Sequence, residues 1–207
     1  MTLVLPTDFE RLFVARTHSH PIEIAAADAP TGSRMGGARP ELLGVVACPQ
    51  CARPLAYWAT LESDVLSMRG PEPEALSILF CPDFDCRYDA HYPIDPSPVV
   101  VVTHPSSPRR SSNDVDPAAF EGRSLVLGGL RADAQPRSER SKLGGRPGYI
   151  QGEEIGEEFD ANGYEFLLQL DDMSRVPGYP APFSHGTLYL FQDREAPSKL
   201  RAFYQSS

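Results

Sequence analysis

The sequence predicts an α+β fold that is rich in β-strand, with few short helices and two similar antiparallel β halves. Three observations predict this class. The 207 residues include 21 prolines and 16 glycines, which interrupt long helices and favour short strands joined by turns. Apolar residues gather in short runs bounded by polar or turn-forming residues. Several landmarks also recur in the second half of the chain in the same order, as an internal duplication would produce.

Short apolar runs mark the expected strands, and no run is long enough to cross a membrane. The expected strands cover residues 42–47, 55–61, 75–80, 99–102, 124–127, 164–170 and 187–191. One short helix is expected over residues 8–15, because Thr7 can act as its N-cap with Glu10 at the third helical position.

The best-defined landmark of the duplication is a serine, a basic residue, an apolar residue and two glycines. It occurs at residues 33–37 and again at 141–145, and comparable strands follow each copy at similar spacing. We expect tight structural turns here, because glycine adopts positive φ without steric cost. The glycines concerned are Gly36, Gly37, Gly144 and Gly145. A phosphate-binding loop is disfavoured because no Lys-Ser or Lys-Thr pair follows. Chance resemblance between short β motifs is the alternative to duplication.

The duplication divides the chain into three stretches within one compact domain. Residues 1–102 form the first β-rich half, and residues 141–207 form the second. Residues 103–140 are polar and rich in proline, which is typical of a linker or loop-rich segment.

All four cysteines lie in the first half, as two close pairs. Cys48 and Cys51 form C-P-Q-C, and Cys81 and Cys86 form C-P-D-F-D-C. Two residues between cysteines let both thiolates reach one ion, and a second pair completes a tetrahedral shell. The spacing predicts a closed structural Zn²⁺ site with these four ligands. His91 lies near the second pair and could replace one cysteine.

Three other interpretations of the cysteines stay open: free thiols, disulfides, and a redox-active C-x-x-C pair. The start of the chain, M-T-L-V-L-P-T-D, shows no secretory signal. We therefore expect a cytoplasmic protein with reduced thiols, which weighs against disulfides. A redox-active pair normally lies at a helix start in a thioredoxin-like pattern, and this chain shows no such pattern.

The charge balance is acidic. Nineteen basic residues face 28 acidic ones, for a formal net charge of −9. An acidic chain repels phosphate backbones, which weighs against nucleic-acid binding. Opposite fields speed encounter, so the charge favours a basic protein partner. A solvated acidic surface without such a partner is the alternative.

No catalytic set is evident in the sequence, which lacks G-x-S-x-G, H-E-x-x-H and a glycine-rich phosphate loop. His18 and His20 would lie on one face of a strand, but a third metal ligand is not evident. The acidic run over residues 153–160 is typical of a solvated loop. A hydrolase that uses His91 or His185 beside carboxylates stays open as an alternative, as does a zinc-ribbon nucleic-acid binder.

Two parts of the chain resemble known families. Residues 141–151 (SKLGGRPGYIQ), 164–172 (YEFLLQLDD) and 186–193 (GTLYLFQD) resemble the YwqG-like family of bacterial proteins. The first half, with its Gly-Gly element, C-P-Q-C-A-R-P-L and second cysteine pair, resembles the related eukaryotic programmed cell death protein 2 group. The chain departs from the YwqG-like pattern by its first-half cysteines, and Gln192 stands where the duplication would place Cys81.

The resemblance covers about residues 33–92 and 141–205. It implies a β-rich fold with two similar halves, no established enzyme activity, and protein binding of the chaperone or toxin-immunity type. Composition, charge and resemblance together favour a non-enzymatic protein-interaction module with structural zinc. The sequence leaves its oligomeric state open.

Overall fold

The β-rich class is confirmed in a computed structural model: strands account for 46% and helices for 15% of the residues that it describes. The structure describes residues 6–25, 32–62, 74–83, 85–86, 97–105, 122–134, 137, 140–171, 186–196 and 199–206. These residues form two compact units. Unit 1 consists of the described parts of residues 24–126, and unit 2 of those of residues 2–23 and 127–207.

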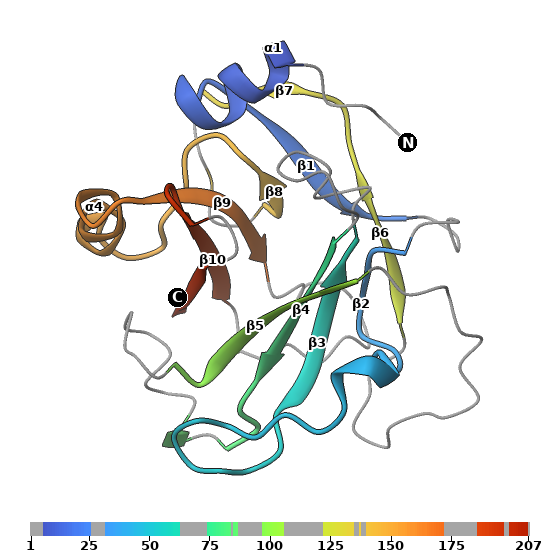
Figure 1. Cartoon of the computed structure of the whole chain (residues 1–207). Coiled ribbons are helices and arrows are strands. Elements are labelled where there is room, and N and C mark those ends of the chain that lie inside the picture. The colour runs from blue at the N-terminus through green and yellow to red at the C-terminus, as the bar shows by residue number, and fades with distance from the viewer. Residues whose placement is uncertain are drawn as a thin grey trace. The chain divides into compact units, whose positions relative to one another are not determined.

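Unit 1 is an antiparallel sheet built around a three-stranded meander. Strands β3 (Ala56–Leu61), β4 (Glu74–Phe80) and β5 (Val99–Pro105) lie side by side (Figure 1). The short β2 (Arg34–Met35) pairs with β3 and with β6 (Arg123–Leu127), so the order is β6-β2-β3-β4-β5. The apolar side chains of these strands are buried, among them Trp58, Leu61 and Ile78.

In unit 2 the strands pair antiparallel in the order β1-β8-β9-β10-β11. Its strands are β1 (His18–Ile24), β8 (Lys142–Leu143), β9 (Tyr164–Asp171), β10 (Gly186–Asp193) and β11 (Leu200–Ser206), and β7 (Arg131–Ala132) pairs with β1. The helical segments are α1 (Pro6–Phe9), the π-helix η1 (Glu10–Val14) and α4 (Glu154–Ala161). Phe159 of α4 stacks on Phe191 at 4.5 Å between ring centroids, inside an aromatic cluster of the sheet.

Both units carry the same backbone arrangement at their glycine pairs. The N–H of Gly36 donates to the carbonyl of Trp58 at 2.7 Å, and the N–H of Gly144 donates to that of Leu167 at 2.8 Å. Trp58 and Leu167 each lie at a register shift between two long strands, as a β-bulge produces. All four predicted turn glycines have positive φ, between 71° and 78°.

The serine before each glycine pair also repeats its role. The Ser33 hydroxyl accepts from the N–H of Glu62 at 2.9 Å, and the Ser141 hydroxyl accepts from the N–H of Asp171 at 3.0 Å. These matched bonds support the internal duplication, which stays a prediction.

Six of the seven expected strands are confirmed, with ends that differ by at most three residues. The expected helix over 8–15 corresponds to α1 and η1, but Thr7 is not its N-cap, because α1 begins at Pro6 and includes Thr7. The strand expected over 42–47 is wrong. The 3-10 helix η2 (Glu41–Leu43) ends at Gly44, whose φ of 53° and ψ of −151° take the chain out of strand geometry. Ala47 alone forms a bridge, to Pro54.

The acidic run over 153–160 is a helix, α4, and not the expected loop. Ile155 and Phe159 lie one helical turn apart and pack on the unit 2 core, while the acidic residues between them face outward. The segment 103–140, expected to be a linker, contributes β6 and β7. Among the described residues, no helix is both long enough and apolar enough to cross a membrane.

A buried ion pair supports the second glycine turn. The ammonium of Lys142 donates to Asp133 at 2.6 Å, and the N–H of Arg146 donates to the same carboxylate oxygen at 2.9 Å. Burial lowers the pKa of Lys142, and its hydrogen bond to Asp133 opposes that shift. The carboxylate therefore neutralises an ammonium that has little access to water.

We expect Asp133→Asn to lower the free energy of unfolding by about 2 kcal/mol, because the amide keeps the shape but removes the compensating charge. Urea denaturation of both proteins measures the change. Glu23→Gln is the matched control, because Glu23 pairs with Arg131 at an exposed site and should contribute under about 1 kcal/mol. Equal losses in the two variants would contradict the role given to Asp133.

Candidate metal centre

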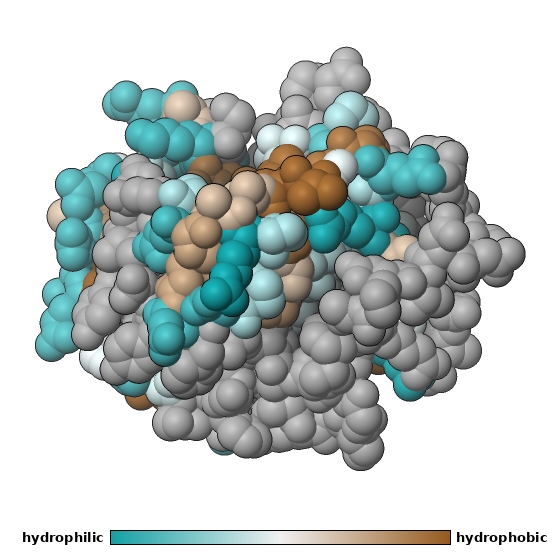
Figure 2. Space-filling view, turned by 90° about the horizontal axis from the view of Figure 1, so that it is seen from below, coloured by the Kyte–Doolittle hydropathy of each residue, from teal (hydrophilic) through white to brown (hydrophobic). Residues whose placement is uncertain are grey.

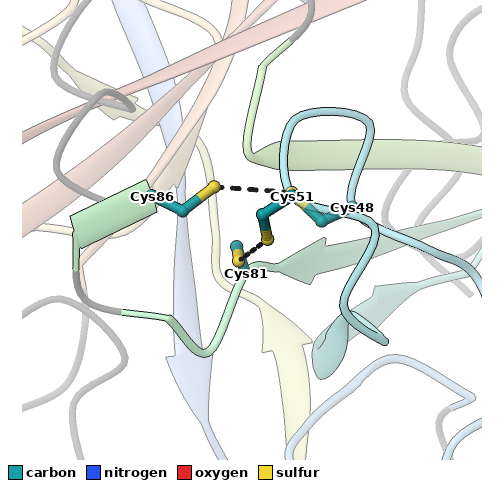
Figure 3. A group of neighbouring side chains, drawn as sticks. All are labelled: Cys48, Cys51, Cys81 and Cys86. Atoms are coloured by element: carbon teal, nitrogen blue, oxygen red, sulfur yellow. Dashed lines mark hydrogen bonds between the residues drawn. The ribbon is translucent and has the colours of Figure 1, made fainter.

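The four cysteines of unit 1 converge on one point (Figure 3). Their Sγ atoms all lie within 4.8 Å of one another. Two contacts connect one pair to the other, at 3.6 Å between the Sγ atoms of Cys48 and Cys86 and 3.4 Å between those of Cys51 and Cys81. Four thiolates bound tetrahedrally at about 2.3 Å from an ion would be about 3.8 Å apart. None of the four forms a disulfide, so the cluster has the size and chemistry of a metal site.

The first cysteine pair is held by a tight backbone turn. The N–H of Cys48 donates to the carbonyl of Arg53 at 2.7 Å, and the N–H of Ala52 donates back to the carbonyl of Cys48 at 2.9 Å. Ala52 has a φ of 60°, which closes the turn in a conformation that non-glycine residues rarely adopt. The turn brings the side chains of Cys48 and Cys51 to the same side.

The second pair begins where β4 ends. Cys81 directly follows β4, and its N–H donates to the carbonyl of Pro98 at 2.9 Å. The N–H of Cys86 donates to Asp83 Oδ1 at 3.1 Å. Asp83 also pairs with Arg53 at 2.7 Å through its other oxygen. One carboxylate thus connects the two cysteine loops, and the hydrogen bond from Cys86 together with the charge of Arg53 keeps the pKa of Asp83 below its ordinary value.

Asp83→Ala should weaken zinc binding about tenfold, because residues that orient metal ligands typically contribute that much or more to affinity. Competition with a chromogenic chelator gives the affinity. Asp85→Ala removes an exposed carboxylate from the same loop and should leave the affinity unchanged. A similar loss in both variants would mean that loop charge, and not the bonds of Asp83, supports the site.

Burial differs across the four thiols. Cys48 and Cys81 are buried in an apolar cluster with Leu55 and Leu79, while Cys51 is exposed. Burial raises the pKa of Cys81 to about 11 and also raises the pKa of Cys86. A backbone hydrogen bond from Arg53 lowers the pKa of Cys51. A bound divalent cation would favour the thiolate at every ligand.

In unit 2, the position that corresponds to Cys81 is occupied by an aspartate. Ile78 pairs with Ala59, and Leu190 pairs with Leu168 in the same way, so the residue that matches Cys81 is Asp193. The expectation that Gln192 occupies this place is therefore wrong by one residue. The match extends to the backbone, because the N–H of Asp193 donates to the carbonyl of Lys199 at 3.0 Å, as that of Cys81 does to Pro98.

Asp193 stabilises the short connection between β10 and β11. Its Oδ1 accepts from the N–H groups of Glu195 at 2.9 Å and Ala196 at 3.1 Å. These bonds hold the pKa of Asp193 below its ordinary value. The connection between β10 and β11 in unit 2 is therefore a short hairpin. The corresponding connection in unit 1, between β4 and β5, is longer, and the second cysteine pair lies at its start.

Of the histidines singled out in the sequence, the two that lie in the described part of the chain do not join the cysteine cluster. His20 is buried, and its Nδ1 bonds to the carbonyl of Gly128 at 2.8 Å. His18 Nδ1 lies 2.9 Å from the hydroxyl of Thr17. His91 and His185 lie outside the described residues.

One series of buried side-chain hydrogen bonds was not expected from the sequence. The hydroxyl of Tyr57 donates to Thr60 at 2.8 Å, Thr60 lies 2.7 Å from the hydroxyl of Ser77, and Ser77 lies 2.8 Å from His104 Nε2. His104 Nδ1 lies 2.9 Å from the carbonyl of Pro105. A carbonyl only accepts, so Nδ1 carries a proton towards Pro105.

The Ser77–His104 pair has the reach of a nucleophile and its base. Ser77, however, is 0% exposed, so a substrate would not reach it in this arrangement. This series of hydrogen bonds is better explained as a structural link across β3, β4 and β5, in which each buried hydroxyl has a hydrogen-bond partner. Its signal in the sequence is two small hydroxyl residues, Thr60 and Ser77, inside otherwise apolar runs.

Comparison with known proteins adds no assignment: no family model matches the chain, and no curated protein matches it.

Proposed function

We propose that this protein is a non-enzymatic protein-interaction module whose cysteine cluster holds one structural Zn²⁺ ion. The observation that carries the proposal is the convergence of four Sγ atoms within 4.8 Å. Four protein ligands complete a tetrahedral shell, and catalytic zinc sites instead keep one position open for water or substrate. Soft thiolates select zinc over the harder Mg²⁺ and Ca²⁺ ions.

The site's place in the fold supports a structural role. Cys48 and Cys81 share an apolar cluster with Leu55 and Leu79, so an ion here would join the packed sheet to the exposed turn at Cys51. A bound metal would act as a staple between the chain before β3 and the chain after β4.

A protein-binding surface is supported by the loop that leads into the first cysteine pair. Val45 is 80% exposed and Leu42 is 49% exposed. The loop is ordered by Arg39, whose guanidinium donates to the carbonyls of Gly44 at 2.8 Å and Leu55 at 3.0 Å. Apolar residues also gather among hydrophilic ones on the face shown in Figure 2. Rigidly presented apolar side chains are typical of protein contact sites.

The charge of the chain suggests the kind of partner. With a net charge of −9, the protein would attract a basic segment and hold it less well as salt rises. This fits a chaperone of a basic client or an immunity protein for a basic toxin, the two roles that the family resemblance implies.

Metal analysis of the purified full chain, expressed with zinc supplied, tests the metal part. We expect one zinc ion per chain, and none in Cys48→Ser. A pull-down from native lysate tests the binding part. A specific partner should be captured by the native protein, weakened by salt and lost with Val45→Asp. Val14→Asp is the matched control, because Val14 is an exposed valine of unit 2. Zinc-free protein, or the absence of any specific partner, would reject the corresponding part.

A further inference from the structure

The four thiols are unequally accessible, and this asymmetry bears on what an oxidant would do. Cys48 and Cys81 have exposed fractions of 2% and 0%, whereas Cys51 is exposed and Cys86 is intermediate. Oxidants attack sulfur according to thiolate character and access. Metal coordination makes all four sulfurs thiolates, so access decides which one reacts first.

Two Sγ–Sγ contacts indicate a partner for the first oxidised sulfur. The Sγ of Cys51 lies 3.4 Å from that of Cys81, and the Sγ of Cys48 lies 3.6 Å from that of Cys86. A disulfide bond is about 2.05 Å long, so either bond would form after a movement of roughly 1.5 Å. Both contacts join the two cysteine loops, so each supports a disulfide between the loops.

We propose that the metal centre is a peroxide-responsive switch in which Cys51 is oxidised first and forms a disulfide with Cys81, releasing the metal ion. This inference rests on the proposed zinc site. The bound state would be the reduced, stapled form of unit 1. The oxidised state would keep a link between the same two loops through a covalent bond.

The chemistry balances with hydrogen peroxide as the oxidant. The Cys51 thiolate attacks one peroxide oxygen, the O–O bond breaks, and hydroxide leaves while Cys51 becomes a sulfenic acid. The Cys81 thiolate then attacks the Cys51 sulfur, so an S–S bond forms, the S–O bond breaks and a second hydroxide leaves. Two protons from solvent convert both hydroxides to water. Two thiolates have lost two electrons, and one peroxide has gained them.

Loss of two of the four ligands should release the metal ion. Cys48 and Cys86 would remain as two thiolates, which is half of the tetrahedral shell that structural zinc requires. A second peroxide could join them through their 3.6 Å contact. Dithiothreitol followed by zinc should restore the original state.

The test treats zinc-loaded full-length protein with limiting hydrogen peroxide in the presence of dimedone, which traps sulfenic acids. Mass spectrometry, with fragmentation between Cys48 and Cys51, identifies the modified sulfur. We expect at least about tenfold more adduct on Cys51 than on either buried cysteine. Without dimedone, we expect one zinc ion released for each disulfide formed, with Cys51–Cys81 as the first disulfide.

The outcomes separate the two proposals. Protein that holds no zinc when purified reduced would reject the structural zinc site. Protein that holds zinc but keeps it under peroxide, or that first forms Cys48–Cys51, would overturn the switch and leave the zinc site intact. Cys51→Ser adds a second check if it still binds zinc, because it should then release the ion at least about tenfold more slowly under the same peroxide.

Discussion

Cys81→Ser should remove the bound zinc and lower the melting temperature by about 8–16 °C. The expected loss in free energy of unfolding is about 4 kcal/mol, similar to that of a lost structural disulfide and well below the full binding energy of a structural zinc ion. For a chain of this size each kcal/mol corresponds to about 2–4 °C. Cys81 carries this effect because it is buried beside Leu55 and Leu79 and is fixed at the end of β4.

Calorimetry with parallel elemental analysis measures both quantities. A chelator should shift the native protein by a similar amount and leave Cys81→Ser unshifted, because both treatments remove the same ion. Pro49→Ala is the matched control: it changes an exposed residue between the first two ligands and should keep the zinc. A Cys81→Ser protein that melts like the native one while lacking zinc would show that the ion does not stabilise the fold.

The ligand set could be predicted from the sequence because its signal is local. Cys48 and Cys51 lie within one turn, and spacing alone brings their thiolates together. The bonds that support the ligands were not predictable in this way. Asp83 reaches both the N–H of Cys86 and the guanidinium of Arg53, and the contact with Arg53 depends on how two distant loops meet.

The strands, like the metal ligands, could be predicted where their signal in the sequence is local. Long apolar runs such as β9 and β10 are visible in the sequence because nearly every residue of each strand is buried, on both faces. The two-residue strands β2 and β8 carry too few residues to show a period. The apolar run at 42–47 was misleading because Leu42 and Val45 are exposed, and burial is what relates apolar sequence to strand structure.

Helix α4 and strand β11 were not predicted from the sequence, α4 because of its many charged residues and β11 because of its mixed composition. In α4 the two apolar contacts, Ile155 and Phe159, stand among five acidic residues over 153–160. β11 (Leu200–Ser206) mixes polar and apolar residues, yet Phe203 and Tyr204 are buried because β10 pairs along its length. Both elements are stabilised by tertiary packing and not by local propensity.

Gly145→Ala should lower the free energy of unfolding by about 4 kcal/mol, because strain and crowding coincide at this glycine. Gly145 has a φ of 77°, and a side chain in this region costs about 1–2 kcal/mol. A Cβ would also lie 2.3 Å from Asp133 Oδ2 and 3.0 Å from the carbonyl oxygen of His18. Asp133 cannot move away cheaply, because it is bonded to Lys142 and Arg146, so overpacking adds roughly 1–3 kcal/mol.

Two other glycines separate strain from crowding, with urea denaturation as the measurement. Gly163 has a φ of 82°, and a Cβ at this position would meet no atom within 4 Å, so Gly163→Ala should cost about 1–2 kcal/mol from strain alone. Gly129 has open space and no positive φ, so Gly129→Ala should stay within about 0.5 kcal/mol of the native protein. If Gly145→Ala matched Gly163→Ala, the buried carboxylate would not be crowding the turn, and the glycine at 145 would be required by backbone conformation alone.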